Sequence, residues 1–267
     1  MRLRKITLLR TLAITAIIAA GPALAADLPI KAPVRAPVAA MYSWTGTYIG
    51  VNVGYSWGKS NDDVSYLPDP AFFGEEPFSI SATLKGGLGG VQFGYNWQVQ
   101  RIVLGIEADI DAAGIKGDHF LQPLPGFANL AISYHAHQEI NWLGTVRGRL
   151  GFTPADRALF YVTGGFAFAQ IKTNSLSSGA PPTNQFAQSN STWKGGWTAG
   201  AGIEWALLDS WTAKIEYLHY DLGHQDLTAF PLAPNPPFAF TNHWTTKGDI
   251  VRVGLNYRFG GPVVARY

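Results

Sequence analysis

Apolar and non-apolar residues alternate along most of the chain. From residue 49 to residue 58 every odd-numbered position is apolar and every even-numbered position is small or polar. Successive side chains of a β-strand point to opposite faces, so this segment predicts a strand with one apolar face. The same period recurs at residues 91–97, 102–110, 140–152, 160–168, 197–207, 211–220 and 251–259. The pattern therefore predicts an all-β protein of eight strands.

The connections between these segments alternate between short and long. Tight turns are predicted at residues 98–102, 152–157 and 207–211, and the last two contain the turn-forming residues Pro, Asp and Ser. The other four connections, residues 59–85, 112–137, 172–194 and 223–248, are long and rich in Gly, Pro, Asn, Ser and Asp. Neighbouring strands are then antiparallel, with the long loops at one end and the short turns at the other.

The composition indicates which face of the strands is enclosed. Only 14% of the residues are charged, and the polar face is mostly Gly, Ser, Asn, Gln and Thr. A water-exposed face is usually dense in Lys and Glu. The apolar face carries large aromatic residues that eight closed strands could not enclose. We therefore predict an eight-stranded antiparallel transmembrane up-and-down β-barrel, with its apolar face toward lipid and a polar interior.

Aromatic residues of the apolar face lie near the predicted strand ends. Tyr55, Trp57, Trp142 and Trp197 lie toward the long loops, and Tyr95, Trp97, Trp205 and Trp211 lie toward the short turns. Two such girdles are typical of the two interfaces of a membrane barrel. The alternative is that aromatic residues simply favour strands, but that preference would not sort them by depth.

The N-terminus has the features of a secretory signal peptide. Four basic residues precede an apolar run at residues 11–20, and Ala23-Leu24-Ala25 supplies a cleavage site, so residues 1–25 are predicted to be removed. The run is too short for a membrane anchor, which is the alternative. Cleavage changes the formal net charge from +2 to −2, which leaves little support for nucleic-acid binding. Residues 26–43 form a Pro-rich periplasmic leader, residues 44–259 the barrel and residues 260–267 a C-terminal tail.

The alternation also places ionisable residues inside the barrel. The acids are Glu107, Asp109, Asp111, Glu139, Glu204 and Glu216, and the bases are Arg147, Arg149, Lys214, Arg252 and Arg258. Buried charges are tolerated when they are paired, so we predict a salt-bridge network across the lumen near Glu107, Arg147, Glu216 and Arg252. Such a network would close the lumen. The alternative is a narrow channel for ions or small solutes.

Other chemistry has weaker support. The chain has no cysteine, which excludes disulfides and cysteine-ligated metals. His135, His137 and Glu139 fall on one side of an extended segment, but histidines near a loop boundary are usually just solvated, so no metal or other cofactor is predicted. A lipid A-modifying enzyme would need a histidine near a serine or carboxylate. His219 and Ser210 lie toward opposite ends, so no catalytic residue is predicted.

Three segments resemble a known family. Residues 44–50 (WTGTYIG), 214–223 (KIEYLHYDLG) and 251–259 (VRVGLNYRF) are similar to the porin-like outer-membrane immunogenic proteins, the surface antigens of α-proteobacteria, which are related in fold to the OmpA and OmpX barrels. The resemblance implies a monomeric surface antigen of the cell envelope, in contact with outer-membrane lipids and lipopolysaccharide. Tyr257 and Phe259 resemble the aromatic-terminated signal of the outer-membrane assembly machinery, although Tyr267 at the terminus is an alternative.

The long loops are the natural place for contact with the outside. They are rich in aromatic residues, and exposed aromatic clusters often mark binding surfaces. Eleven of these residues are Tyr66, Phe72, Phe73, Phe78, Phe120, Phe127, Phe186, Phe230, Phe238, Phe240 and Trp244. Adhesion to a host or surface ligand through the four loops is therefore one expected role. Packing of these residues on one another is the alternative.

Overall fold

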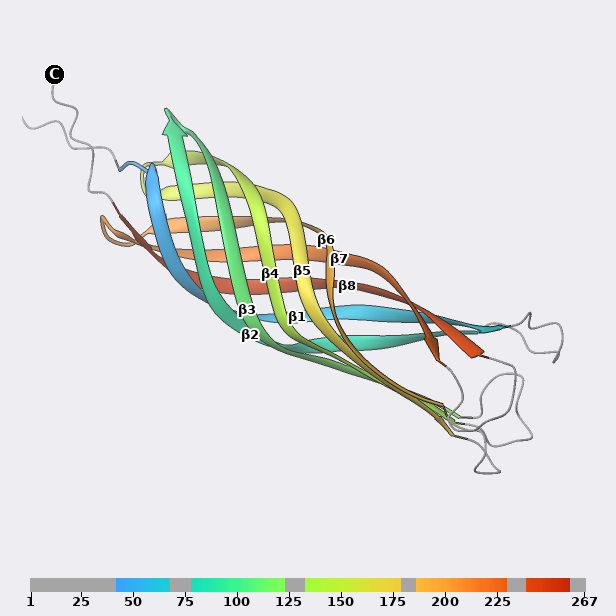
Figure 1. Cartoon of the computed structure of the whole chain (residues 1–267). Helices are drawn as coiled ribbons and strands as arrows, with labels where there is room; N and C mark the ends of the chain where they lie inside the picture. The colour runs from blue at the N-terminus through green and yellow to red at the C-terminus, as the bar shows by residue number, and fades with distance from the viewer. Residues whose placement is uncertain (1–41, 68–77, 123–132, 179–185, 230–238, 260–267) are drawn as a thin grey trace, which may run out of the picture. The chain divides into compact units, whose positions relative to one another are not determined.

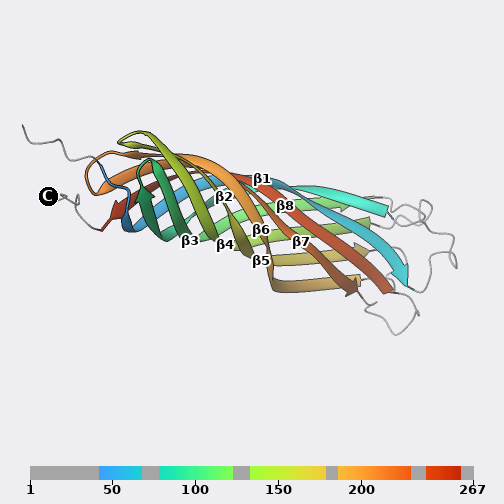
Figure 2. The same ribbon diagram turned by 90° about the horizontal axis from the view of Figure 1, so that it is seen from above.

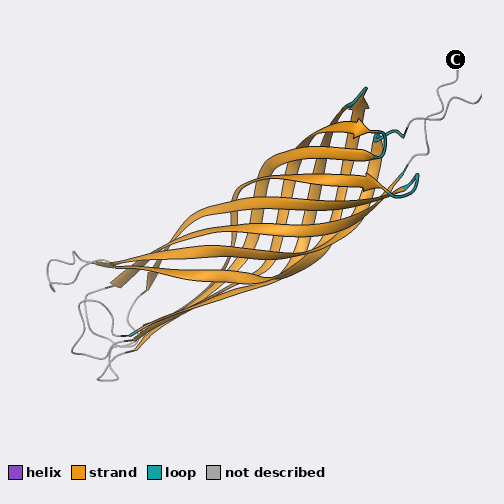
Figure 3. Cartoon of the chain, turned by 180° about the vertical axis from the view of Figure 1, so that it is seen from behind, coloured by secondary structure: helices purple, strands orange, loops and turns teal. Residues whose placement is uncertain are grey.

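A computed structural model describes residues 42–67, 78–122, 133–178, 186–229 and 239–259. They form eight strands: β1 (Gly46–Leu67), β2 (Phe78–Val99), β3 (Ile102–Leu121), β4 (Ser133–Ala155), β5 (Ala158–Ser178), β6 (Phe186–Ala206), β7 (Trp211–Ala229) and β8 (Ala239–Arg258). Each strand pairs antiparallel with the next, and β8 pairs with β1 to close the barrel (Figures 1 and 3). The predicted fold is confirmed.

The predicted terminal segments lie almost entirely outside the described residues. The signal peptide, the leader up to residue 41 and the tail of residues 260–267 are not described, so their boundaries stay predictions. Within the described residues, no helix is long and apolar enough to cross a membrane.

The strands are longer than the apolar alternation predicted. The three tight turns are confirmed, since two residues separate β2 from β3 and β4 from β5, and four residues separate β6 from β7. At the opposite end, however, much of each predicted long loop is strand: β1 continues to Leu67, and β2 already begins at Phe78. In that region polar residues occur on both faces, as at Asn61 and Asp62, and apolar residues such as Val64 and Trp244 lie on the inner face. The strands therefore continue where the regular apolar alternation has ended.

The outer face of the barrel is apolar. Val53, Phe93 and Ile106 are each more than half exposed, whereas Gln92, Glu107 and Asn256 on the inner face are almost completely buried. The two predicted girdles lie on this outer face, where Tyr55, Trp57, Trp97, Trp142, Trp197, Trp205 and Trp211 are exposed and Tyr95 is partly exposed. This distribution is the reverse of a soluble barrel and fits a lipid-facing wall.

The closed ring of strand pairing ends before the strands do. Pairing between β2 and β3 is registered from Val99 to Lys85, and pairing between β6 and β7 is registered from Ala206 to Trp197. Beyond these points the described strands form two separate sheets, β7-β8-β1-β2 and β3-β4-β5-β6. In Figure 1 the ends of β1 and β2 diverge from those of β4 and β5, and Figure 2 shows the same strands from above. We call this part of the barrel the extension.

A bulge in β4 reverses the alternation of that strand near the start of the extension. The register shifts in β4 between Ile140 and Trp142, opposite a second shift in β3 between Ala112 and Ile115. The extra residue in β4 changes the face of the side chains beyond it, whereas β3 keeps the same alternation of exposed and buried residues through its shift. Ile140 is therefore completely buried inside. Glu139, which simple alternation placed inside, points outward and pairs with Lys116. Its predicted lumenal position is wrong.

Candidate functional site

The centre of the lumen is filled by a network of charged side chains. Alternating positions on five strands supply them: Glu107, Asp109 and Asp111 on β3, Arg147 and Arg149 on β4, Glu204 on β6, Lys214 and Glu216 on β7, and Arg252 on β8. Glycines on the same face leave room for the long side chains. A Cβ at Gly94, for example, would come within 2.3 Å of the Tyr48 hydroxyl.

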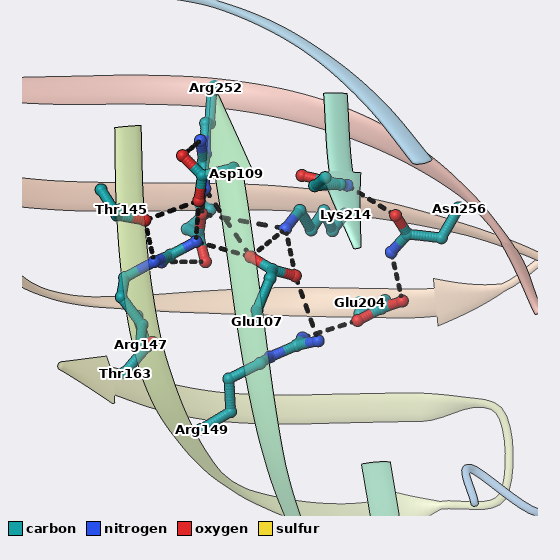
Figure 4. A network of polar contacts seen from close by, with 12 residues as sticks. Glu107, Asp109, Thr145, Arg147, Arg149, Thr163, Glu204, Lys214, Arg252 and Asn256 are labelled. Atoms are coloured by element: carbon teal, nitrogen blue, oxygen red, sulfur yellow. Dashed lines mark hydrogen bonds and ion pairs between the residues drawn. The ribbon is translucent and has the colours of Figure 1, made fainter. Parts of the chain in front are cut away.

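Glu107 accepts contacts from several sides of the lumen (Figure 4). Arg147 Nη2 lies 2.5 Å from Oε1, and Lys214 Nζ lies 2.8 Å from Oε1 and 2.9 Å from Oε2. The Tyr48 hydroxyl donates to Oε2 at 2.8 Å. These side chains are fully or almost fully buried. A buried carboxylate with this many charged and hydroxyl donors is well compensated for its loss of water.

Two arginines, Arg147 and Arg252, both contact the acids Asp109 and Glu216. Arg252 donates to Glu216 Oε2 at 2.8 Å from Nε and to Asp109 Oδ2 at 3.1 Å from Nη2. Arg147 bridges the same two acids, at 3.0 Å to Glu216 Oε1 and 3.0 Å to Asp109 Oδ2. The Thr145 hydroxyl accepts from Arg147 Nε at 2.8 Å and donates to Asp109 Oδ2 at 2.6 Å. The result is a continuous set of hydrogen bonds that connects β3, β4, β7 and β8.

Arg149 extends the network toward the tight turns. Its Nη2 atom donates to Glu204 Oε2 at 2.6 Å, and its guanidinium carbon lies 4.0 Å from the centre of the Tyr161 ring. Asn256 Nδ2 also donates to Glu204, at 2.9 Å. Pairing with both a carboxylate and an aromatic face is typical of a buried arginine.

The lumenal charges are balanced in number. With Glu139 on the outside, the inward-facing residues named from the sequence come to five acids and five bases, counting Arg258 near the turns, while Asp62 is a further buried acid in the extension. Arg258 donates to the Asp209 carbonyl at 2.9 Å. The structure thus brings together eight of the inward-facing residues that the sequence analysis named, which are Glu107, Asp109, Arg147, Arg149, Glu204, Lys214, Glu216 and Arg252.

The short-turn end of the lumen is closed by Trp44. Its side chain is 1% exposed and packs with Val103, Leu159 and Tyr161. Its backbone N–H donates to Gln98 Oε1 at 2.6 Å, and its indole N–H donates to the Asp156 carbonyl at 3.2 Å. Tyr42 packs edge-on against it, and burial raises the pKa of the Tyr42 hydroxyl. Sequence reasoning missed this cap, because Trp44 precedes the alternating segment.

The other side of the network is closed by an apolar layer. Leu84, Ile115, Ile140, Leu143, Leu218 and Ile250 are buried in one cluster inside the barrel. The prediction of a uniformly polar interior is therefore wrong. Part of the cause is the bulge in β4, which turns Ile140 inward, whereas Ile115 already lies on the inner face of β3 by simple alternation. The charged centre lies between this layer and the Trp44 cap, and both exclude water from it.

The other candidate residues lie apart from this centre. His137 Nδ1 lies 2.7 Å from Asp118 on the outer face, and Glu139 pairs with Lys116. No group of three His, Asp or Glu side chains in the described part of the chain could hold a metal ion. His219 pairs with Asp249 on the outer face, whereas Ser210 lies in the turn between β6 and β7. These two residues are not brought together.

The predicted assembly and loop residues are only partly described. Tyr257 and Phe259 are exposed on the outer face, and the Phe259 N–H donates to the Thr47 carbonyl at 2.8 Å. Of the eleven loop aromatics, Trp244 is buried in the extension and Phe120 is exposed. Phe72, Phe73, Phe127, Phe230 and Phe238 lie outside the described residues, as do the side chains of Tyr66, Phe78, Phe186 and Phe240.

A closed eight-stranded barrel with an apolar exterior, two aromatic girdles and paired charges inside defines an integral outer-membrane barrel. Sequence comparison agrees with the structure. The chain belongs to the family described as "Outer membrane protein beta-barrel domain", which matches residues 32–259. Its location is the outer membrane.

Two relatives and one solved structure illustrate the family. The chain is 38% identical over 182 residues to the 31 kDa outer-membrane immunogenic protein of Brucella melitensis, covering 68% of this chain and 70% of that protein. It is 32% identical over 141 residues to the 22 kDa outer membrane protein of Rhizobium leguminosarum, covering 52% and 55%. The structure of OprG from Pseudomonas aeruginosa has a TM-score of 0.50 at 12% identity, covering 81% of this chain and 97% of that one. That likeness concerns the fold alone.

Proposed function

We propose that this protein acts as a closed monomeric barrel, a structural component and surface antigen of the outer membrane, and neither a pore nor an enzyme. The observation that carries the proposal is the closed lumen. Arg147 and Arg252 tie β4 and β8 to acids on β3 and β7, and the Trp44 cap and the apolar layer lie on either side. Eight strands enclose a space that side chains can fill, whereas water-filled porins use about 16 strands.

Conductance measurements test this proposal against a narrow channel. We expect the purified mature chain to give no open steps in planar bilayers, while a general porin inserted in the same bilayers shows that pores are detected. Reproducible open steps of the wild-type chain would contradict the closed barrel. An envelope role predicts that cells without the protein become more sensitive to detergent, and that the wild-type gene restores resistance.

Adhesion through the surface loops is the second candidate function. It is favoured by the extension, which carries the ends of all eight strands beyond the closed ring. The test is the binding of bacteria to host cells or matrix with and without the protein. An antibody against the extension should block binding, whereas an antibody against the turn at residues 156–157 should not. Equal binding of cells with and without the protein would exclude this role.

A further inference from the structure

The lysines of the barrel are concentrated at one level of its outer wall. Of the seven lysines in the described residues, five point outward: Lys59, Lys85, Lys116, Lys172 and Lys247. The strand register shows that they form a belt. Lys59 faces Lys247 across β1 and β8, Lys85 faces Lys116 across β2 and β3, and Glu139 connects Lys116 with Lys172. The arginines in the described residues lie instead in the lumen or in the turns at the other end.

Four consecutive strands each contribute one lysine to this belt: β8, β1, β2 and β3. Two of the cross-strand pairs, Lys59 with Lys247 and Lys85 with Lys116, oppose like charges, an arrangement that destabilises a sheet. Acids offset only part of this charge. Asp221 lies 3.0 Å from Lys247, and Glu139 pairs with Lys116. Lys59 and Lys85 form no ion pair with any described residue, so they leave positive charge uncompensated.

A groove lies on the outer wall beside Lys59 and Lys247. It has a volume of about 380 Å³, and Trp57, Asn61, Thr83 and His219 also line it. Asp249 is the one acid among its lining residues, and its Oδ1 atom already accepts from the Tyr217 hydroxyl at 2.6 Å and lies 2.9 Å from His219 Nδ1. The groove therefore combines an aromatic surface with basic and neutral polar groups.

The belt lies at the edge of the membrane. Trp57, which belongs to the girdle on the side of the extension, is paired directly with Lys85. The Lys85–Lys116 pair is also where the registered pairing of β2 with β3 ends. Backbone groups must be paired within hydrocarbon but can be solvated outside it, so this end marks the boundary of the lipid. The lysines are thus at the depth of lipid headgroups.

We propose that Lys247, Lys59, Lys85 and Lys116 bind the phosphorylated headgroup of an outer-leaflet glycolipid, the lipid A part of lipopolysaccharide. Phosphate oxygens would accept charge-assisted hydrogen bonds from the ammonium groups, and Trp57 would contact the sugar or the start of the acyl chains. A soluble polyanion is the less favoured ligand, because the lysines lie at the membrane edge and not at the tip of the extension.

The experiment measures binding of bisphosphorylated lipid A to the full mature chain in detergent by native mass spectrometry. The test variant is Lys59→Gln with Lys85→Gln. The control variant is Arg101→Gln with Arg157→Gln, which removes the same charge from exposed positions in the turns at the other end. We expect the test variant to bind about 30-fold more weakly, since each lysine near an anionic lipid surface contributes about a fivefold factor. The control variant should bind like the wild type.

Further probes distinguish the sources of phosphate and charge. Lipid A without phosphates should bind to wild type and test variant alike. Unchanged binding of phosphorylated lipid A to a folded test variant would overturn the proposal. So would efficient competition by inorganic phosphate alone, which would indicate a free-phosphate site. If the test variant loses heparin binding but keeps lipid A binding, the lysines serve a soluble polyanion. Heat-modifiable mobility in gels shows whether each variant is folded. If the double variant is not folded, the single variant Lys59→Gln replaces it.

Discussion

Lys214 on β7 reaches across the lumen to Glu107 on β3, with its Nζ atom 2.8 Å from Oε1. Three strands separate β3 from β7 in either direction around the ring. The contact therefore spans the full width of the barrel and ties opposite walls together, and its geometry depends on closure.

Removing either partner of this contact should destabilise the folded barrel. We expect Lys214→Met or Glu107→Gln to lower the free energy of unfolding by about 3–5 kcal/mol, because each leaves buried charge without its partner. The double variant should lose less than the sum of the two. Urea unfolding of the wild type and the three variants, refolded in lipid vesicles, completes this double-mutant cycle. Strictly additive losses of unfolding free energy would show that the two residues do not interact.

The reversed face at Glu139 gives a direct comparison between two glutamates that simple alternation placed inside. Glu204→Gln should lower the free energy of unfolding by about 3 kcal/mol or more, because it weakens the buried pair with Arg149. Glu139→Gln should change it by about 1 kcal/mol or less, because its pair with Lys116 is exposed. The same unfolding measurement serves for both. Equal losses would mean that the bulge in β4 is absent.

The Trp44 cap should matter more than a tryptophan on the outer wall. Trp44→Ala should destabilise the barrel by about 3–5 kcal/mol, since it empties a fully buried site. Trp193→Ala is the matched control, because Trp193 is 54% exposed, and a loss of about 1 kcal/mol or less is expected. The cap would be unnecessary if both variants unfolded at the same urea concentration.

The orientation in the membrane can be tested with single cysteines, because the natural chain has none. Asn61→Cys lies in the extension and should react with a membrane-impermeant maleimide on intact cells. Asp156→Cys lies in the turn between β4 and β5 and should react only after the outer membrane is permeabilised. Labelling of Asp156→Cys on intact cells would reverse the topology.

The assembly signal can be located by comparing two C-terminal changes. Phe259→Ala should lower the fraction of folded protein in the outer membrane several-fold, because it removes the exposed aromatic residue directly after the end of β8. Deletion of residues 260–267 should leave that fraction nearly unchanged. Heat-modifiable mobility of outer-membrane fractions gives the measurement. The opposite result would assign the signal to Tyr267.

The fold and the lumenal residues could be predicted because side-chain direction in a strand has a period of two. That period assigns Glu107, Arg147 and Arg252 to one face without knowledge of their partners. It fails at a bulge, where one extra residue sends Glu139 outward and Ile140 inward. It also gives no clear signal where polar residues occur on both faces, as at Asn61 and Asp62 in the extension.

The partners within the lumen could not be predicted in the same way. Which charges meet depends on how far each strand is shifted against its neighbour around the whole ring. The sequence shows Glu107 and Lys214 only as two inward residues more than a hundred positions apart. The Trp44 cap was missed because a single aromatic residue before the first strand carries no periodic signal.

The numerical balance of the lumenal ions bears on how the barrel matures. Each half of the chain taken alone would expose unpaired charge, since the acids of β3 find bases on both β4 and β8. A partly assembled sheet would therefore carry ions into hydrocarbon at high cost. Only the completed ring neutralises them. The network can thus serve as a checkpoint that favours release of finished barrels into the bilayer over unfinished ones.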